Sequence, residues 1–316
     1  MKKYKFILLS ASALVSSCGE SFDPDFDIEP IAVLNSMVMP GNEVTATISH
    51  SYVSSSGSMS PSAVADRIIK DAIVELYVND VYVGNMEYDA TESRYISQTM
   101  INSGDLVKIK AATSRYGNAI GSTCLPREMN NASWSFTVTT ETDYDTSMIS
   151  PDGSITHPKS RIFNYAITFT DPADDENYYF LMSESFDFEC DDPIMGENDS
   201  PLDAVYSNNS RYLIFSDRSI SGKQYTINCK FKKNTSSWWD VESVNNLCLY
   251  SISKDYYLYL LSIYKKYEGL NGALESIGLA EPKFIYSNVN PGVGIVASQT
   301  PVVDIRHDIS EYLEEE

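Results

Sequence analysis

Short runs of alternating apolar and polar residues, separated by turn-forming residues, cover most of the chain and constrain its fold more than any other feature. Val44–Ser49 alternates in this way, and Asp71–Met86 carries two such runs on either side of Asn79–Asp80. Alternation with a period of two is typical of strands with one buried face, and an Asn-Asp pair between two runs indicates a hairpin. The sequence therefore predicts a mainly β protein.

Residues 31–138 are expected to form an antiparallel β-sandwich of immunoglobulin or transthyretin type. Strands are expected at Ile31–Val38 and Leu106–Ala111, among others, and no long helical pattern interrupts them. Short antiparallel strands at this spacing bury their apolar faces between two sheets. Trp134 and Phe136 are expected on the strand that leaves this sandwich.

A polar, turn-rich segment at residues 139–160 is predicted to link the sandwich to a second β-rich domain at residues 161–316. This domain is expected to open with a hairpin of Ile162–Thr170 and Tyr178–Ser183, because both runs are rich in β-branched and aromatic residues. One long amphipathic helix is expected at about residues 253–267, where apolar side chains recur every three or four residues.

The net charge limits the kinds of partner, whereas the cysteines leave the pattern of disulfide bonds open. The chain has 23 Lys and Arg against 44 Asp and Glu, a formal net charge of −21. Nucleic acid is not an expected partner, because phosphate contacts require Lys and Arg concentrated on one face. Beyond Cys18, the sequence does not decide the pairing of the remaining cysteines, which are Cys124, Cys190, Cys229 and Cys248.

The first 17 residues resemble the signal peptide of a bacterial lipoprotein. A lysine-rich head precedes the apolar run Phe6–Leu14, and small residues then lead to Cys18. In that class of signal the cysteine is acylated and becomes the new N-terminus, so lipid on Cys18 is expected to anchor the protein to the outer membrane. An ordinary secretion signal with an incidental cysteine is the alternative.

Residues 18–30 are acidic and contain two prolines, which predicts an extended tether between the lipid and the first domain. Acidic residues directly after the cysteine resemble the export signal that sends Bacteroidetes lipoproteins to the cell exterior. A solubilising linker without a sorting role would have the same composition.

An ordered set of motifs across nearly the whole mature chain resembles a family of Bacteroidetes outer-membrane lipoproteins, domain of unknown function 4249. The matching pieces are the lipobox cysteine, the first strand with Pro40–Gly41, Asp71–Val74, Phe169–Pro172, Asn177–Tyr179, Phe215–Asp217, Ser221–Gly222, Ser253–Tyr257 and Tyr286–Ile295. Pro291–Gly292 departs from the family, which usually has two glycines before the position of Val293. The resemblance implies association with TonB-dependent transporters in nutrient uptake, and it implies no catalytic residues.

No motif of a hydrolase is present. The chain lacks Gly-x-Ser-x-Gly, His-Glu-x-x-His and a phosphate-binding glycine loop. His50, His157 and His307 stand apart in the sequence, so none is predicted to be a general base. We therefore expect a protein that is not an enzyme, although the many carboxylates leave a surface hydrolase open.

Two acidic runs are candidate calcium ligands, because Ca²⁺ takes six or more oxygen ligands and tolerates irregular loops. Their carboxylates belong to Asp171, Asp174, Asp175, Asp187, Glu189 and Asp191. Neither run has the spacing of a twelve-residue calcium loop, and turn chemistry between two strands also explains the first. No other metal and no cofactor is expected.

Trp238 and Trp239 lie in a polar segment and are the candidate ligand contacts. Adjacent residues of a strand point to opposite faces, so one indole is expected inward and the other outward. An exposed indole usually contacts a ligand, a partner or a membrane.

These features together predict a surface-exposed lipoprotein that captures a ligand for a TonB-dependent transporter or assists it. The alternative is a cell-surface adhesin or fimbria-related subunit, since lipoproteins of two sandwiches also build pili. The acidic C-terminus, Ile309–Glu316, is unlike the donor strand that such polymers require.

Overall fold

A computed structural model of the chain gives the fold. It describes residues 29–52, 66–142, 144, 147–149, 153–157, 159–173, 175–183, 212–234, 244–267 and 284–313. The strands are β1 (Ala32–Val38), β2 (Val44–His50), β3 (Ile73–Val78), β4 (Val81–Asn85), β5 (Glu87–Asp89), β6 (Arg94–Ser97), β7 (Leu106–Ala112), β8 (Asn118–Cys124), β9 (Ser133–Thr142), β10 (Met148–Ile149), β11 (Ile155–Thr156), β12 (Lys159–Thr170), β13 (Tyr178–Ser183), β14 (Tyr212–Ser216), β15 (Gln224–Asn234), β16 (Val244–Ile252) and β17 (Val293–Asp308). The helices are α3 (Lys254–Tyr267) and α5 (Ser310–Leu313).

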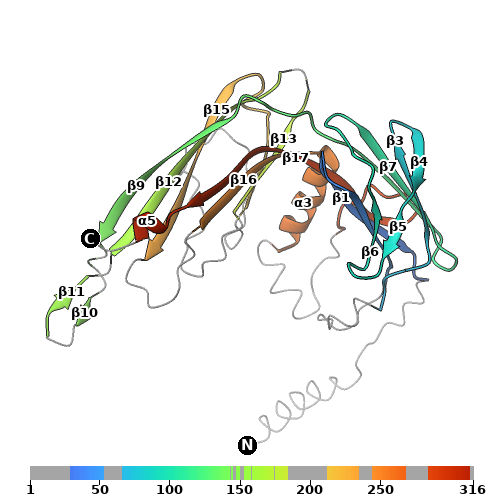
Figure 1. Cartoon of the computed structure of the whole chain (residues 1–316), viewed down its shortest axis with the longest axis horizontal. Coiled ribbons are helices and arrows are strands. Elements are labelled where there is room, and N and C mark those ends of the chain that lie inside the picture. The colour runs from blue at the N-terminus through green and yellow to red at the C-terminus, as the bar shows by residue number, and fades with distance from the viewer. Residues whose placement is uncertain are drawn as a thin grey trace, which may run out of the picture.

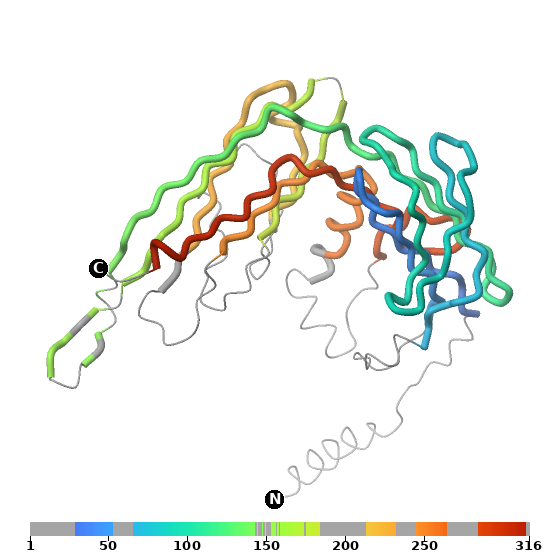
Figure 2. The backbone as a smooth tube through the Cα atoms, in the orientation of Figure 1, coloured from blue at the N-terminus to red at the C-terminus, as the bar shows by residue number. Residues whose placement is uncertain are grey.

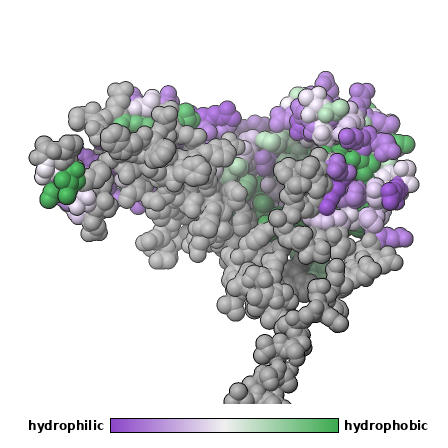
Figure 3. All heavy atoms as spheres, turned by 90° about the horizontal axis from the view of Figure 1, so that it is seen from below, coloured by the Kyte–Doolittle hydropathy of each residue, from purple (hydrophilic) through white to green (hydrophobic). Residues whose placement is uncertain are grey.

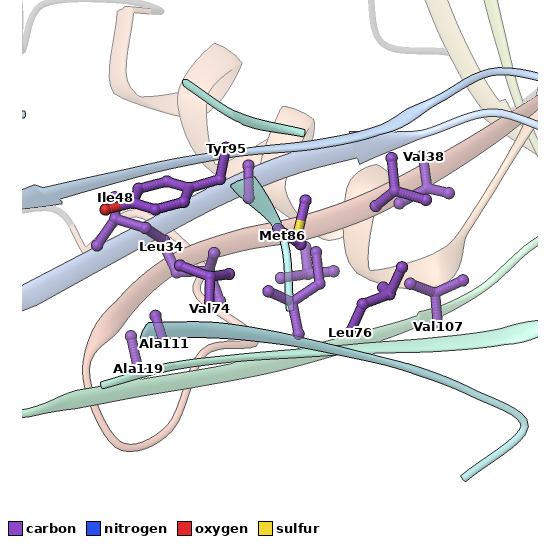
Figure 4. Close-up of a cluster of buried hydrophobic side chains, with 14 of the residues drawn as sticks. Leu34, Val38, Ile48, Val74, Leu76, Met86, Tyr95, Val107, Ala111 and Ala119 are labelled. Carbon is purple, nitrogen blue, oxygen red and sulfur yellow. The ribbon is translucent and has the colours of Figure 1, made fainter. Parts of the chain in front are cut away.

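The predicted turn at Asn79–Asp80 joins β3 to β4. Both turn residues have positive φ, 51° and 62°, which is the backbone of a two-residue hairpin turn of type I′. The sheet β4-β3-β7-β8 faces β1 and β2. Figure 4 shows side chains of the two layers, among them Leu34 and Leu76, pointing toward one another in the first core. The mainly β fold with an N-terminal sandwich is confirmed.

The second core lies between the sheet β15-β12-β9 and the strands β14, β13, β16 and β17. Aromatic side chains fill it, including Phe163, Phe215 and Phe231, all of which are buried. Helix α3 covers the opposite face of β13 and β14, where Leu260 packs with Phe180 and Ile214. The helix lies where its periodicity predicts, but its 14 residues make it short, so the expectation of a long helix is wrong.

Strand β17 belongs to both sandwiches. Val293–Ser298 pairs in parallel with β1, and Gln299–Asp308 pairs antiparallel with β16. The two halves therefore share one eight-stranded sheet in the order β14-β13-β16-β17-β1-β2-β6-β5. Figure 1 shows the sandwiches as the two arms of an arch, with β17 running along both and α3 inside.

Strand β9 is the strand that was expected to leave the first sandwich, and it carries Trp134 and Phe136 into the second. The strand pairs with β12 from Ser133 to Thr142 and so belongs to the second sandwich. Alternation shows that a segment is a strand with one buried face, but it does not show which sheet the strand joins.

The predicted hairpin of Ile162–Thr170 and Tyr178–Ser183 is also wrong. Both segments are strands, but β12 pairs with β9 and β15 whereas β13 pairs with β14 and β16. The residues between them carry the chain from one layer of the sandwich to the other. Buried hydrogen bonds of Asp171 hold this crossing in place, as described below.

Gly294 allows β17 to approach β1. Its φ is +127°, and a Cβ atom at this position would lie 2.0 Å from the carbonyl oxygen of Leu34. A side chain would therefore push the two backbones apart at the point where the sandwiches are joined. Gly117 also has a positive φ, +78°, but a Cβ atom there would meet nothing within 4 Å.

We expect Gly294→Ala to lower the free energy of unfolding by about 3 kcal/mol or more, because it combines backbone strain with a clash against backbone. Gly117→Ala is the control and should cost about 1 kcal/mol, because it introduces the strain alone. Urea unfolding followed by circular dichroism measures both. Equal losses for the two variants would contradict a tight junction at Gly294.

Candidate functional site

Most of the residues that the sequence singled out lie outside the described residues: Cys18, Asp174, Asp187, Glu189, Cys190, Asp191, Trp238 and Trp239. Within the described ranges, no group of three or more His, Cys, Asp or Glu side chains is placed to hold a metal ion. Lipid on Cys18, calcium in the acidic runs and ligand contact by the two tryptophans therefore stay predictions.

Asp171 is the calcium candidate whose surroundings are best defined. Its side chain is 2% exposed, and its carboxylate accepts hydrogen bonds from the Tyr179 hydroxyl and from the Gly222 amide, the latter at 3.1 Å. Burial raises the pKa of Asp171 above its ordinary value, and these two donors oppose the rise. Both carboxylate oxygens thus have donors within the protein, and one of these donors, Gly222, is distant in the sequence.

Asp217 supports the same crossing from the other side. Its carboxylate accepts a hydrogen bond of 2.8 Å from the Asn177 amide, and its own amide bonds to the Asn177 carbonyl oxygen at 3.0 Å. Asp171 and Asp217 therefore tie the β12–β13 crossing to the turn that precedes β15. Asp175, the other described candidate, is exposed.

An aromatic cluster, consisting of Trp134, Phe136, Tyr165, His307 and Tyr312, lies at one side of the second sandwich. Strand β9 supplies the first two rings, β12 the third, β17 the imidazole and α5 the last. The Phe136 ring centroid is 4.1 Å from that of His307, and the Trp134 centroid is 5.7 Å from it. The rings of β9 and β17 thus meet across the two layers of the sandwich.

Two of these rings, Tyr165 and His307, also take part in a chain of hydrogen bonds with Asn245. Asn245 Nδ2 donates to the Tyr165 hydroxyl oxygen at 2.9 Å, and that oxygen is 2.7 Å from His307 Nδ1. The tautomer of His307 decides whether Tyr165 or His307 donates in the second of these bonds. Burial lowers the pKa of His307, whereas the acidic Glu311 and Asp308 oppose this change.

The rings of the cluster differ in their exposure to solvent. Tyr165 is only 1% exposed, whereas Trp134 is 41% exposed, so the indole is the broad ring surface that a ligand could reach. Aromatic faces with a few polar groups are typical of binding sites for small molecules and proteins. Asn245 Oδ1, which is buried, has no hydrogen-bond partner among the described residues.

Sequence reasoning missed this site. It treated His307 as isolated, and it did not identify the sheet that the strand of Trp134 and Phe136 joins. The alternation of Trp134 and Phe136 with Ser and Thr shows that the two rings share one face of a strand. Only the pairing of β9 with β12 and of β16 with β17 brings that face against His307.

A family model, described as a domain of unknown function (DUF4249), matches residues 20–303. No curated protein matches the chain. Among the described residues, no helix is long and apolar enough to cross a membrane.

Two solved structures show weak similarity. One is a putative membrane anchored protein from Corynebacterium diphtheriae, with 10% identity, a TM-score of 0.21 and coverage of 72% of this chain and 55% of that one. The other is the major pilin subunit of Bacillus cereus, with 10% identity, a TM-score of 0.22 and coverage of 72% and 65%. The chain thus spans under two thirds of either protein, and TM-scores this low support no conclusion about fold or function.

Removing the Tyr179 hydroxyl should destabilise the crossing between the two layers. We expect Tyr179→Phe to lower the free energy of unfolding by about 1.5–3 kcal/mol, because a buried carboxylate loses a donor. Tyr178→Phe is the neighbouring control: its hydroxyl donates to Glu176, which is exposed, so the loss should stay below about 1 kcal/mol. Urea unfolding at pH 7 compares them, and a larger loss for Tyr178→Phe would refute this role of Asp171.

His307 should make stability depend on pH. Its lowered pKa in the folded state means that the unfolded chain binds the proton more readily, so its contribution is complete above the ordinary histidine pKa of about 6.5. That contribution is lost as the pH falls through the lowered pKa. Between pH 7.5 and pH 5, the free energy of unfolding should therefore fall less in His307→Gln than in the parent. His50→Gln is the control, and identical pH curves for His307→Gln and the parent would argue against a partly buried imidazole that is neutral in the folded state.

Proposed function

We propose that this chain, which belongs to the DUF4249 family, acts at the cell surface as an outer-membrane lipoprotein. In this proposal it is not an enzyme, and it serves a TonB-dependent nutrient transporter as an accessory or ligand-capturing partner. The aromatic cluster carries the proposal, because it presents the exposed Trp134 indole beside a buried chain of polar groups. Ring surfaces of this kind contribute strongly to binding when a ligand or partner covers them.

The shared sheet supports this role. Strand β17 pairs with β1 in the first sandwich and with β16 in the second. It therefore holds the aromatic cluster at a fixed position relative to β1, which is the first strand of the described chain. Residues 18–30 would connect β1 to the lipid on Cys18, and 13 extended residues span at most about 45 Å. A tether of that length keeps the arch within reach of a membrane-embedded transporter.

Calcium enters the proposal only as an ion that the carboxylates of the acidic runs would bind. It would take no part in binding at the aromatic cluster. Asp175 is exposed and available for such a role. Asp171 is less suited to it, because its carboxylate is buried and each of its oxygens already accepts a hydrogen bond, from Tyr179 and from Gly222.

Purification of the tagged chain from detergent-solubilised outer membranes tests the proposal. We expect a large TonB-dependent barrel to copurify with it, and we expect Cys18→Ser to release the chain from the membrane fraction. Trp134→Ala should weaken capture of the transported nutrient by about tenfold, as for a central aromatic contact. Tyr82→Ala, an exposed tyrosine of the first sandwich, is the matched control and should leave capture unchanged.

Two results would count against this function. A lone lipoprotein whose deletion leaves nutrient uptake unchanged would remove the transporter from the proposal. Homopolymers of the chain on the cell surface would instead favour the adhesin or fimbria-related alternative.

A further inference from the structure

The edges of the sheets differ in how well they are protected. An edge strand has unpaired backbone N–H and C=O groups, and proteins block such edges by shortness, charge, proline, irregularity or a covering segment. Strands β4, β5 and β14 have at most five residues each. Strand β8 is covered, because Asn290 N donates to the Ile120 oxygen at 2.8 Å and Ile120 N donates to the Pro291 oxygen at 3.2 Å.

The long edges are also blocked, with one exception. Strand β15 contains three lysines, Lys230, Lys232 and Lys233. The half of β17 that extends beyond β1 contains Pro301 and a shift in register against Leu249 and Tyr250. Each of these features disfavours the addition of another strand.

Within the part of the chain that the structure describes, strand β9 has none of these devices apart from one charged residue. It has ten residues, contains no Lys, Arg, Pro or Gly, and carries a single charge at Glu141. Its register against β12 is unbroken from Ser133 to Thr142, and no other described strand pairs with its second edge. In Figure 2, β9 follows the outer boundary of its arm, with no other described segment outside it.

The tip beyond β9 is apolar and exposed. After Thr142 the chain continues through Tyr144 into the small hairpin of β10 and β11, where Tyr144, Ile149 and Ile155 are 76%, 77% and 67% exposed. Figure 3 shows an apolar group at the end of the arm, where Figure 1 places this hairpin. Neighbouring exposed apolar side chains indicate a contact surface, and this one continues the open edge.

We propose that the β9 edge binds an extended, basic segment of a partner protein, which adds to the sheet as a fourth strand beside β9. Backbone hydrogen bonds to an exposed edge provide affinity in this mode of recognition, and alternate side chains provide specificity. Alternate side chains of the added strand would contact Trp134 on the face of the aromatic cluster. The proposal is independent of the transporter, because it concerns binding to the isolated chain.

Charge favours a basic partner over a second copy of this chain. The net charge is −21, so two copies repel each other, whereas a segment with Lys or Arg is attracted to the whole surface. Asp308 and Glu311 lie near His307 in the aromatic cluster and add negative charge on this side. A lysine beside Trp134 would also gain from the electron-rich face of the indole.

Peptide binding to the full-length chain in detergent tests the proposal. The probes are a fluorescent peptide, Lys-Val-Thr-Val-Lys-Val-Thr-Val-Lys, and the same peptide with Glu in place of each Lys, both followed by anisotropy. We expect saturable binding of the lysine peptide, and binding of the glutamate peptide that is weaker by about tenfold or more.

The protein variants locate the site. Thr137→Lys with Thr139→Lys gives the β9 edge the kind of charge that β15 already has, at two exposed positions on the face opposite the aromatic cluster. This pair should weaken binding of the lysine peptide by about tenfold or more. Gln224→Lys with Asn228→Lys adds the same charge at exposed positions of β15 and should change binding by less than about twofold. Urea unfolding verifies that both double variants remain folded.

Three outcomes would overturn the proposal. The first is no saturable binding of the lysine peptide, and the second is an equal loss of binding in the β9 and β15 variants. The third is a dimer of the parent in sedimentation that Thr137→Lys with Thr139→Lys converts to monomer, which would make a second copy the occupant of the edge. None of these outcomes depends on whether a transporter copurifies with the chain.

Discussion

The pairing of β17 with β1 is the interaction on which the rest of the structure depends. In this parallel pairing the last strand of the described chain meets the first, and it joins one layer of each sandwich into a single eight-stranded sheet. Asn35 supports it with its side chain, which accepts a hydrogen bond from the Ile295 amide at 3.2 Å. Thr123 and Ser298, both buried, add a hydrogen bond of 2.8 Å between β8 and β17.

Local features of the fold were predictable, and nonlocal ones were not. Asn79–Asp80 identified a hairpin because turn chemistry depends on neighbouring residues, and Ser253 marked the start of α3, where its Oγ accepts a hydrogen bond of 3.4 Å from the Tyr256 amide. The sheet that a strand joins depends on residues far away in the sequence. For that reason the sheet that β9 joins was not predicted, and β12 and β13 were paired although they lie in different sheets.

The candidate site escaped prediction for the same reason. Composition directed attention to Trp238 and Trp239, the adjacent pair in a polar segment, whereas the structure assembles its aromatic cluster from residues between Trp134 and Tyr312. No spacing rule connects His307 with Phe136 before the register of two sheets is known. Asp171 was weighed as a turn residue from its sequence context alone, whereas its hydrogen bonds to Tyr179 and to the distant Gly222 connect two layers of the sandwich.

The course of β17 also affects when the protein can fold. Asn35 and Ile295 are 260 residues apart, so the ribosome releases the strands of the N-terminal sheet well before the strand that completes it. Contacts of such sequence separation slow folding. Until β17 arrives, β1 has an unpaired edge, and the first sandwich is open to pairing with other chains.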